Sequence, residues 1–568
     1  MTQQSNNVPF DFGNVVHGVE SFAVSLINLQ RENMQKSIDY VEFVLPQTLP
    51  PMPNPRNIIQ QQLVGKAPIS LVELEEAFDR IANDNRPRGV VLYLRGLAMP
   101  FADLQTLRDI IQRLRDRGKR VITLSQTYSL ADYYVASAAD EILLQPGGEV
   151  STTGLLQQQV YLKDGLNSIG IEWDAVQITP YKSASDRFTR MEPSDEVDEM
   201  TNWLLDSIFD TVVADIAAGR DMTIEQVQAM IDNAPHLDQS AAEQAYVDGL
   251  VHEETLSNFL KCEHILLWEQ ADNAIPLKSP RPRDKYIAVL YLEGIIINGE
   301  SADPPVDNPV PIVGGPRIGD LTVVRQVRNL QRDDKCAGLV LYVNSGGGSA
   351  TASEAMASAL DAFGRKKPIV VYMGAVAASG GYYISTPADY IFAQSGTLTG
   401  SIGVILGKPV TNDVYQKLKF NAVTYQRGKN ADINRTIAPF NDEQRTKVRA
   451  SIDRIYEQFI ERVADARKMK PDQVDAIAGG RVWTGAQALE NGLVDAIGGL
   501  HEAIDKAREL ANVPATTPFG IVRGKGKPLA AEVLEPADPA ASLRYWMTGL
   551  DAISGANMML MPLDITFE

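Results

Sequence analysis

The chain carries one sequence pattern twice, and this internal repeat limits its fold more than any other feature. Residues 88–94 (RGVVLYL) match residues 337–343 (AGLVLYV), which lie 249 positions later. Nearly the same shift relates four further pairs of segments, namely 119–122 with 367–370, 133–135 with 382–384, 139–140 with 388–389, and 248–251 with 491–494. A register kept over about two hundred residues is hard to obtain by chance, so we predict two diverged copies of one domain.

Each copy alternates strand patterns with helix patterns. The runs at 88–94 and 337–343 are continuously apolar, which is typical of strands buried in a parallel sheet. Helical patterns follow at 104–116 and 352–363. We therefore predict an α/β protein with two tandem domains, each with a mainly parallel sheet flanked by helices. A chain of 568 residues is long enough for two separate hydrophobic cores.

Composition indicates where the two copies begin and end. Three prolines stand among charged residues between 276 and 282 and mark a connector. Apolar residues recur at helical spacing between Val15 and Leu29, and the apolar run Met558–Met561 is expected to be docked. The predicted organisation is an amino-terminal helical segment at 1–38, a first repeat at 39–258, a linker at 259–283, a second repeat at 284–513 and a carboxy-terminal tail at 514–568.

Charge and composition exclude several classes of function. A formal net charge of −19 would repel nucleic acid, so we expect no binding to DNA or RNA. The two cysteines and five histidines form no CxxC, HExxH or HxH spacing, so we expect no metal site and no cofactor. His17 and Glu20 interrupt the apolar run at 15–29, which argues against a bilayer span or a signal peptide there. We expect a cytoplasmic or peripherally membrane-associated protein.

The two copies differ most in two segments of small residues. After the shared strand, the second copy reads NSGGGS at 344–349, where the first copy reads RGLAMP at 95–100. Consecutive glycines let backbone N–H groups approach a ligand, but this loop lacks the Gly-Lys-Ser/Thr ending of a P-loop and the GxGxxG spacing of a dinucleotide site. Further on, Ser379 stands in AASGG, opposite Leu130 of the first copy. A serine between a predicted strand and helix is a candidate nucleophile, although such sequences also form ordinary tight turns.

A nucleophilic serine needs a base, and the second copy has no histidine between Tyr286 and Val494. A Ser-His-Asp triad within that copy is therefore excluded. A lysine can replace the histidine if burial lowers its pKa toward neutrality. Lys182 and Lys429 occupy similar positions in the two copies, and both remain candidates on this reasoning.

Five segments together resemble the signal peptide peptidase A family, also called protease IV, in its long two-repeat form. The resemblance spans residues 39–510 and rests on NSGGGS (344–349), AASGGYYIS (377–385), LTGSIGV (398–404), YKSA (181–184) and VWTGAQA (482–488). It implies the Clp-protease/crotonase fold and a Ser/Lys dyad split between the repeats. Matched residue by residue, Ser379 is the implied nucleophile and Lys182 the implied general base, with the hydroxyl of Ser401 orienting that base.

The resemblance also implies an oxyanion hole. Its donors are the backbone N–H groups of Gly347 and Gly380, with Gly348 as an adjacent donor, and such donors contribute about 3 kcal/mol each to transition-state stabilisation. The chain departs from the family in two ways. The family often has proline where this chain has Gly346, and its long form usually carries an amino-terminal membrane anchor, which residues 15–29 do not supply.

The predicted activity is that of a serine endopeptidase that cleaves signal-peptide remnants or other small or apolar peptides through an acyl-enzyme. Two alternatives stay open: a crotonase-like acyl-CoA enzyme, which needs neither Ser379 nor Lys182, and a non-catalytic scaffold with a vestigial dyad. The resemblance further implies a ring-like homo-oligomer, for which we expect four subunits. Whether Lys182 and Ser379 meet within one chain or between subunits is left open by the sequence.

Overall fold

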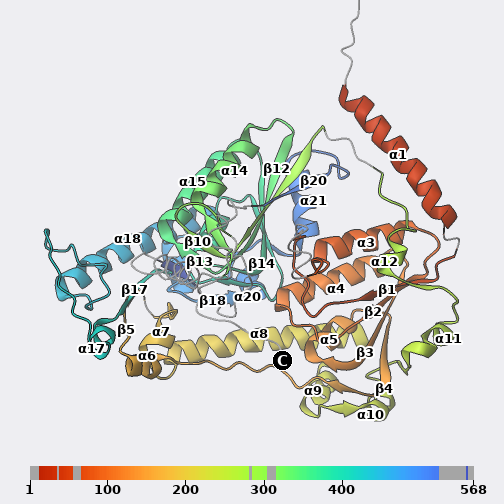
Figure 1. The fold of residues 1–568 in the computed structure, drawn as a ribbon, viewed down its shortest axis with the longest axis horizontal. Helices are drawn as coiled ribbons and strands as arrows, with labels where there is room; N and C mark the ends of the chain where they lie inside the picture. Colours follow the sequence, from red (N-terminus) through yellow and green to blue (C-terminus); the bar gives the residue numbers. More distant parts are fainter. Residues whose placement is uncertain are drawn as a thin grey trace, which may run out of the picture.

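The computed structural model describes residues 12–34, 37–54, 65–178, 180–279, 284–302, 315–523 and 558–560. Within these residues the chain forms two α/β units, one for each copy of the repeat, and a smaller sheet to which both copies contribute (Figure 1). The predicted fold class, an α/β protein with two tandem, mainly parallel sheets flanked by helices, is confirmed.

The first copy is built on a 7-stranded sheet. Its strands are β1 (Tyr40–Val44), β2 (Gly89–Tyr93), β3 (Arg120–Ser129), β4 (Glu141–Ser151), β6 (His236–Leu237), β7 (Gly249–Leu250) and β8 (Ile265–Leu267). The described pairings are parallel except that of β6 with β4. Strand β2 is buried along its whole length, which explains its continuously apolar sequence.

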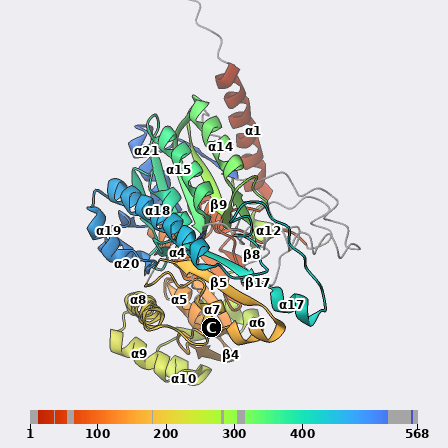
Figure 2. The same ribbon diagram turned by 90° about the vertical axis from the view of Figure 1, so that its left-hand side faces the viewer.

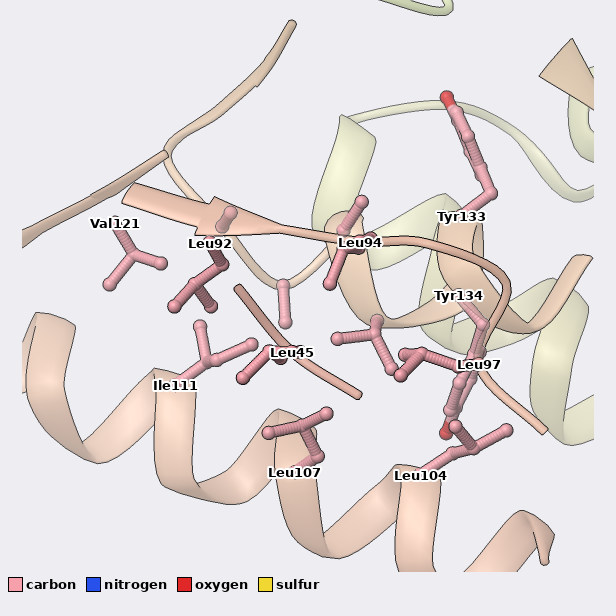
Figure 3. Packing of buried hydrophobic residues seen from close by; sticks show 14 of the residues in the cluster. Leu45, Leu92, Leu94, Leu97, Leu104, Leu107, Ile111, Val121, Tyr133 and Tyr134 are labelled. Atoms are coloured by element: carbon pink, nitrogen blue, oxygen red, sulfur yellow. The ribbon is translucent and has the colours of Figure 1, made fainter. Parts of the chain in front are cut away.

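Helices cover the sheet of the first copy and close its core. They include α3 (Leu71–Asn83), α4 (Phe101–Asp116), α5 (Leu130–Ala136), α9 (Ile224–Asp232), α10 (Asp238–Glu243), α11 (Leu256–Leu260) and α12 (Trp268–Ala271). Figure 3 shows Leu104, Leu107 and Ile111 of α4 turned toward Leu92 and Leu94. The three helix residues recur at i, i+3 and i+7, so one stripe of α4 packs on the sheet.

The second copy repeats this plan on an 8-stranded sheet. Its strands are β9 (Tyr286–Glu293), β12 (Cys336–Ser345), β14 (Ile369–Ala378), β15 (Tyr390–Ala393), β16 (Leu398–Gly400), β18 (Val482–Thr484), β19 (Ala496–Ile497) and β20 (Phe519–Arg523). Its helices are α14 (Asp320–Arg332), α15 (Ala350–Gly364), α16 (Gly380–Ser385), α18 (Asp442–Arg467), α19 (Pro471–Ile477), α20 (Gly485–Glu490) and α21 (Leu500–Leu510).

Equivalent side chains make equivalent contacts in the two copies. The hydroxyl of Tyr133 donates to the carbonyl of Tyr246, and that of Tyr382 donates to the carbonyl of Leu493, both at 2.8 Å. A carboxylate also caps the same strand in each copy. Asp140 accepts from the N–H of Val121 at 2.7 Å, and Asp389 accepts from the N–H of Ile369 at 2.8 Å. The sequence repeat is therefore a repeat of buried contacts as well.

Two strands lie outside the bounds that the sequence indicated for the repeats. Strand β8 falls inside the expected linker at 259–283, and β20 falls inside the expected tail at 514–568. Each pairs in parallel with the first strand of its own sheet, β1 or β9. The sequence does not predict these two strands, because each is short and only partly buried, whereas the chain returns at both places to add one edge strand.

The two copies of one chain are joined along three elements. Strand β5 (Glu172–Gln177) of the first copy pairs antiparallel with β17 (Ile405–Val410) of the second. Helix α4 faces the loop after β15, where its Gln105 side chain accepts a 2.7 Å hydrogen bond from the N–H of Gly396. The long helix α8 (Asp195–Arg220) runs beneath both copies (Figure 1). The indole N–H of its Trp203 donates to the carbonyl of Val482 at 3.0 Å. These contacts fix the first copy against the second.

The joining sheet contains the glycine-rich segment of the second copy. Its order is β11 (Arg317–Gly319), β10 (Ile295–Ile297), β13 (Gly347–Ser349), β21 (Met558–Leu560), β17 and β5. The expectation that the run Met558–Met561 is docked holds for the backbone of 558–560, which forms β21, while Met561 lies outside the described residues. Helices α6 (Lys163–Ile169), α7 (Asp186–Thr189) and α17 (Asn412–Lys417) lie at this side of the molecule (Figure 2).

Helix α1 (Phe12–Met34) stands away from the two copies (Figure 1). Its described contacts run to the segment before the second copy, where Asn28 exchanges hydrogen bonds with the backbone of Leu277. The described helices include none with the length and apolar character that crossing a bilayer requires.

Candidate active site

Ser379 lies at the sharp turn between strand β14 and helix α16. Its backbone has φ 54° and ψ −115°, a conformation that costs an ordinary residue about 1 to 3 kcal/mol. Two backbone hydrogen bonds hold it there: its N–H donates to the carbonyl of Gly400, and its carbonyl accepts from the N–H of Tyr383, both at 2.8 Å. The turn directs the hydroxyl away from the strand and helix axes and toward the first copy.

Lys182 reaches this hydroxyl from the first copy of the same chain. Its Nζ lies 2.7 Å from Oγ of Ser379, although 197 residues separate the two in sequence. The lysine follows strand β5, whose pairing with β17 carries it across to the second copy. Tyr181 anchors the approach, because its N–H donates to the carbonyl of Gly479 at 3.0 Å and its ring lies 4.0 Å under the guanidinium of Arg481.

Two further oxygens surround the amine of Lys182. The backbone carbonyl of Ser401 lies 2.9 Å from Nζ and the Ser401 hydroxyl lies 3.0 Å from it. Lys182 is fully buried, and burial lowers the pKa of its amine well below the usual value, because the charged form loses its hydration. The arrangement therefore presents an amine that can accept a proton, in direct contact with a serine hydroxyl.

Lys429, the other lysine that the sequence left open, lies elsewhere. Its side chain is 77% exposed and forms an ion pair with Glu443 at the start of α18. Of the two candidate bases, the structure brings only Lys182 to Ser379. The contact between Lys182 and Ser379 is formed within one chain, since that chain supplies both residues.

The glycine-rich segment lies beside Ser379 and is packed against the neighbouring strand. At Gly348 (φ 154°) a Cβ would lie 2.0 Å from the carbonyl oxygen of Ile296. At Gly380 a Cβ would lie 2.8 Å from the Ser353 hydroxyl and 3.1 Å from Cα of Gly347. Gly348 thus requires glycine, whereas a side chain at Gly380 would need its neighbours to shift, and the predicted oxyanion residues Gly347, Gly348 and Gly380 are brought together.

The two predicted amide donors differ in their present partners. The N–H of Gly347 donates to the hydroxyl of Ser345 at 3.1 Å, so this donor is engaged within its own loop. The N–H of Gly380 opens helix α16, where no helical carbonyl is available to it, and it makes no hydrogen bond within the described part of the chain. Gly380 therefore supplies the free donor beside Ser379.

Sequence reasoning missed two glycines that make room for Lys182. A Cβ at Gly480 (φ 93°) would lie 2.3 Å from the backbone nitrogen of Lys182, and a Cβ at Gly403 would lie 3.1 Å from its Cδ. Gly403 lies in the segment LTGSIGV (398–404), but the segment alone does not indicate a contact with Lys182. Nothing in the local sequence around Gly480 marks it, because the contact is made across more than two hundred residues.

Gly480→Ala is expected to lower kcat by roughly 100-fold, because a methyl group there must displace Lys182, and a misplacement of about 1 Å can have that effect. Gly492→Ala is the matched control. It has a similar left-handed φ of 73°, yet a Cβ there meets nothing within 4 Å. Both variants should lose some stability in thermal unfolding through backbone strain, whereas only Gly480→Ala should lose turnover. Equal kcat values for the two variants would contradict this packing role.

The corresponding place in the first copy lacks both the nucleophile and the free donor. Asp132 stands opposite Gly381, at which a Cβ would already lie 2.4 Å from the carbonyl of Ser345. The carboxylate of Asp132 accepts a 3.0 Å hydrogen bond from the N–H of Leu97 and a 2.6 Å hydrogen bond from the hydroxyl of Ser129. The carboxylate of Asp132 thus occupies the N–H of Leu97, which is then not available to a substrate. Leu130 takes the place of Ser379.

Comparison with known proteins gives the family. Residues 113–264 and 361–514 match peptidase family S49. The chain is 33% identical to Protease 4 of Salmonella typhi over 464 residues (78% of this chain, 72% of that protein) and 30% identical to the chloroplastic serine protease SPPA of Arabidopsis thaliana over 471 residues (81% and 68%). A putative signal peptide peptidase SppA of Enterococcus faecium is 33% identical over 215 residues (38% and 61%).

Both matched segments fall within the repeated units, one in each copy, which agrees with the resemblance to the long two-repeat form. The match favours a peptidase over the acyl-CoA enzyme and the scaffold that the sequence left as alternatives. The chain belongs to peptidase family S49 and is a serine peptidase.

Proposed function

We propose that this peptidase cleaves peptide bonds through an acyl-enzyme on Ser379, with Lys182 as the general base. The observation that carries the proposal is the 2.7 Å contact between Nζ of a fully buried lysine and Oγ of a serine held on a strained turn. No histidine lies between Tyr286 and Val494, and His501 of α21 pairs with Glu75 of the first copy instead. A lowered pKa gives Lys182 the neutral form that a base requires.

The reaction follows from this contact. The neutral amine of Lys182 takes the hydroxyl proton as Oγ of Ser379 bonds to the carbonyl carbon of the substrate. The resulting ammonium then returns the proton to the leaving amine as the carbon–nitrogen bond breaks, which leaves an ester on Ser379. A water molecule, deprotonated by the same amine, hydrolyses the ester and restores the serine. Ser401 keeps the amine directed at Oγ through its carbonyl and hydroxyl oxygens.

Charge that develops on the substrate oxygen needs donors beside Ser379. The N–H of Gly380 is free to serve, and the N–H of Gly347 serves once it exchanges the Ser345 hydroxyl for the oxyanion. Gly348, the next residue of the same loop, is a further donor of this kind. Each such donor is worth about 3 kcal/mol in the transition state, or roughly 100-fold in rate.

The substrate we propose is an extended peptide with a small or apolar residue before the cleaved bond. The backbone of 558–560 pairs antiparallel with strand β13, Gly347 opposite Leu560 and Ser349 opposite Met558, and an extended substrate would take this edge in place of 558–560. Main-chain pairing of this kind gives affinity that does not depend on the sequence of the peptide, while pockets for its side chains give specificity. The alanines and glycines at 377–381 surround Ser379 with apolar atoms, which favours an apolar side chain before the cleaved bond.

Cleavage of a peptide library tests the proposed substrate class. We expect products that end mainly in alanine or another small or apolar residue, and roughly 100-fold slower cleavage after charged residues. Signal peptides, which the name of the Enterococcus faecium relative gives as its substrate, belong to this class, as do their remnants. The Ser379→Ala variant run in parallel excludes a contaminating protease. A strict requirement for arginine or lysine at the cleaved position would refute the proposed specificity.

A further inference from the structure

The second copy has one residue more than the first copy in the stretch that leads to Ser379. The two copies are offset by 248 positions at Ile122 and Val370 but by 249 positions at Tyr133 and Tyr382. The extra residue therefore lies between these two pairs, in strand β14 or directly after it. A residue inserted into a strand bends the strand and changes how its end meets the neighbouring strands.

Strand pairing narrows the insertion to a short bulge within β14. In the first copy, Ser125 and Thr127 lie two positions apart and pair with residues of β4 that are five positions apart. In the second copy, Met373 and Val376 lie three positions apart and pair with residues of β15 and β16 that are again five positions apart. The extra residue thus lies between Met373 and Val376. The residues after it return to the register of the first copy.

In each copy this irregularity leaves a backbone N–H that a side chain satisfies, but the side chains differ. In the first copy the hydroxyl of Ser125 accepts from the N–H of Thr127 at 3.2 Å, within one strand. Met373 stands at the place of Ser125 and has no hydroxyl. The N–H of Val376 donates instead to Oδ1 of Asn344 at 3.2 Å. In the second copy the acceptor therefore comes from the neighbouring strand β12.

Asn344 also connects the bulge to the glycine-rich segment. Its Nδ2 lies 3.5 Å from Oε1 of Glu293, and its backbone carbonyl accepts from the N–H of Gly294 at 3.0 Å. The carbonyl of Gly294 accepts from the hydroxyl of Ser345 at 2.6 Å, and that hydroxyl accepts from the N–H of Gly347 at 3.1 Å. The residue that satisfies the bulge is thus the first residue of the segment that carries the oxyanion donors.

The inserted residue and the amide of Asn344 occur together, in the copy that carries Ser379. The counterpart of Asn344 in the first copy is Arg95, whose side chain is exposed. A side chain within the bulge itself is poorly placed to replace Asn344, because a Cβ at Gly374 would lie 2.8 Å from the hydroxyl oxygen of the buried Tyr342. Since both copies build the same kind of sheet, the sheet alone does not call for this arrangement.

We propose that Asn344 is a positioning residue for the reaction on Ser379, and that its side-chain amide fixes the nucleophile relative to the oxyanion donors. Asn344 acts through the N–H of Val376 on the turn at Ser379, and through the backbone of its own loop on Gly347. The inference rests on the proposed function, because a positioning role requires Ser379 to be the nucleophile. A displacement of about 1 Å between reacting groups can lower a rate by roughly 100-fold.

Asn344→Ala is expected to lower kcat by roughly 100-fold with KM within about threefold of the wild type, because oxyanion donors act on charge that exists only in the transition state. The labelling rate of Ser379 with a fluorophosphonate probe should fall by a similar factor. Ser125→Ala is the matched control, since it removes the corresponding acceptor from the N–H of Thr127 in the first copy. Both variants should melt at a lower temperature than the wild type, but Ser125→Ala should keep the wild-type kcat.

A double variant separates positioning from a general loss of folding. Asn344→Asp keeps an acceptor for the N–H of Val376 but places a carboxylate opposite Glu293, so kcat should fall by roughly tenfold or more. Combining Asn344→Asp with Glu293→Gln restores one donor and one acceptor with their direction reversed. We expect at least half of the lost kcat, on a logarithmic scale, to return. Circular dichroism checks the fold of each variant, and if Asn344→Ala unfolds, this double variant decides.

Each outcome of these measurements bears on a different statement. Wild-type kcat and labelling in Asn344→Ala would overturn the positioning role and leave the proposed function intact. Equal losses of kcat in Asn344→Ala and Ser125→Ala, or no recovery in the double variant, would overturn it as well. Labelling of the wild-type enzyme at a residue other than Ser379 would refute the proposed function, and the positioning role with it.

Discussion

Ser379→Ala is expected to abolish peptide hydrolysis, with kcat falling by roughly 10⁴-fold or more, because no other group then bonds to the substrate carbonyl. Alanine removes only the hydroxyl. The hydrogen bonds that hold the turn come from the backbone of residue 379 and survive the substitution. Turnover of a chromogenic peptide gives the loss, and circular dichroism shows whether the fold is kept.

Ser385→Ala is a suitable control for this variant. Ser385 is a buried serine in the adjoining helix α16, and its hydroxyl donates to the carbonyl of Gly381 at 2.8 Å without contacting Lys182. We expect turnover within about threefold of the wild type, since only one intrahelical side-chain hydrogen bond is lost. Activity of Ser379→Ala comparable to that of Ser385→Ala would show that another residue is the nucleophile.

Lys182→Met is expected to lower kcat by a similar factor and to change the pH dependence. In the wild type, kcat/KM rises with pH as the amine of Lys182 loses its proton, and it levels off once the neutral form predominates. Because burial lowers the pKa of this amine, the plateau begins well below the usual lysine value of 10.5. The methionine variant has no amine to titrate, so its residual rate should show no such plateau. Peptide hydrolysis across a range of pH measures both effects.

Lys119→Met separates the role of Lys182 from general effects of burying a lysine. Burial also lowers the pKa of Lys119, whose Nζ donates to the carbonyl of Pro87 at 2.7 Å in the first copy. This variant should keep the pH profile of the wild type. A Lys182→Met enzyme with near-normal kcat would remove Lys182 as the base. Lys429 is exposed and pairs with Glu443, so it does not take the place of Lys182 in this conformation.

The same pKa shift has a consequence for stability. Between the lowered pKa of folded Lys182 and the value of about 10.5 in the unfolded chain, the unfolded state binds more protons than the folded state. The contribution of Lys182 to stability therefore rises with pH across that interval. Lys182→Met lacks this contribution, so its melting temperature should vary less with pH there than that of the wild type.

The sequence predicted most of the fold because the repeat supplied an internal comparison. Each strand pattern in one copy is supported by its counterpart in the other. Paired residues also make the same contacts, since the hydroxyls of Tyr133 and Tyr382 donate to equivalent backbone carbonyls. The edge strands β8 and β20 escaped prediction for a physical reason. They are short, only partly buried, and depend on β1 and β9 for their hydrogen bonds, so no local pattern marks them.

The residues of the candidate site also differ in whether the sequence could predict them. Ser379 could be found from its strand-turn-helix context, because that signal is local. Lys182 could not be separated from Lys429 by residues alone, since only the pairing of β5 with β17 carries one lysine to the serine and leaves the other at the surface. The resemblance to a known family selected Lys182, and the folded chain brings Lys182 to the hydroxyl of Ser379. The need for Gly480 became visible only in three dimensions.

Labelling with a fluorophosphonate probe, followed by mass spectrometry of the modified peptide, tests the central claim most directly. The probe forms a phosphorus–oxygen bond with an activated serine and releases fluoride. We predict one adduct, on Ser379, at a rate that rises with pH as Lys182 loses its proton and that falls at least 100-fold in Lys182→Met. An adduct on a different residue, or an unchanged labelling rate in Lys182→Met, would contradict the assignment of Ser379 and Lys182 as nucleophile and base.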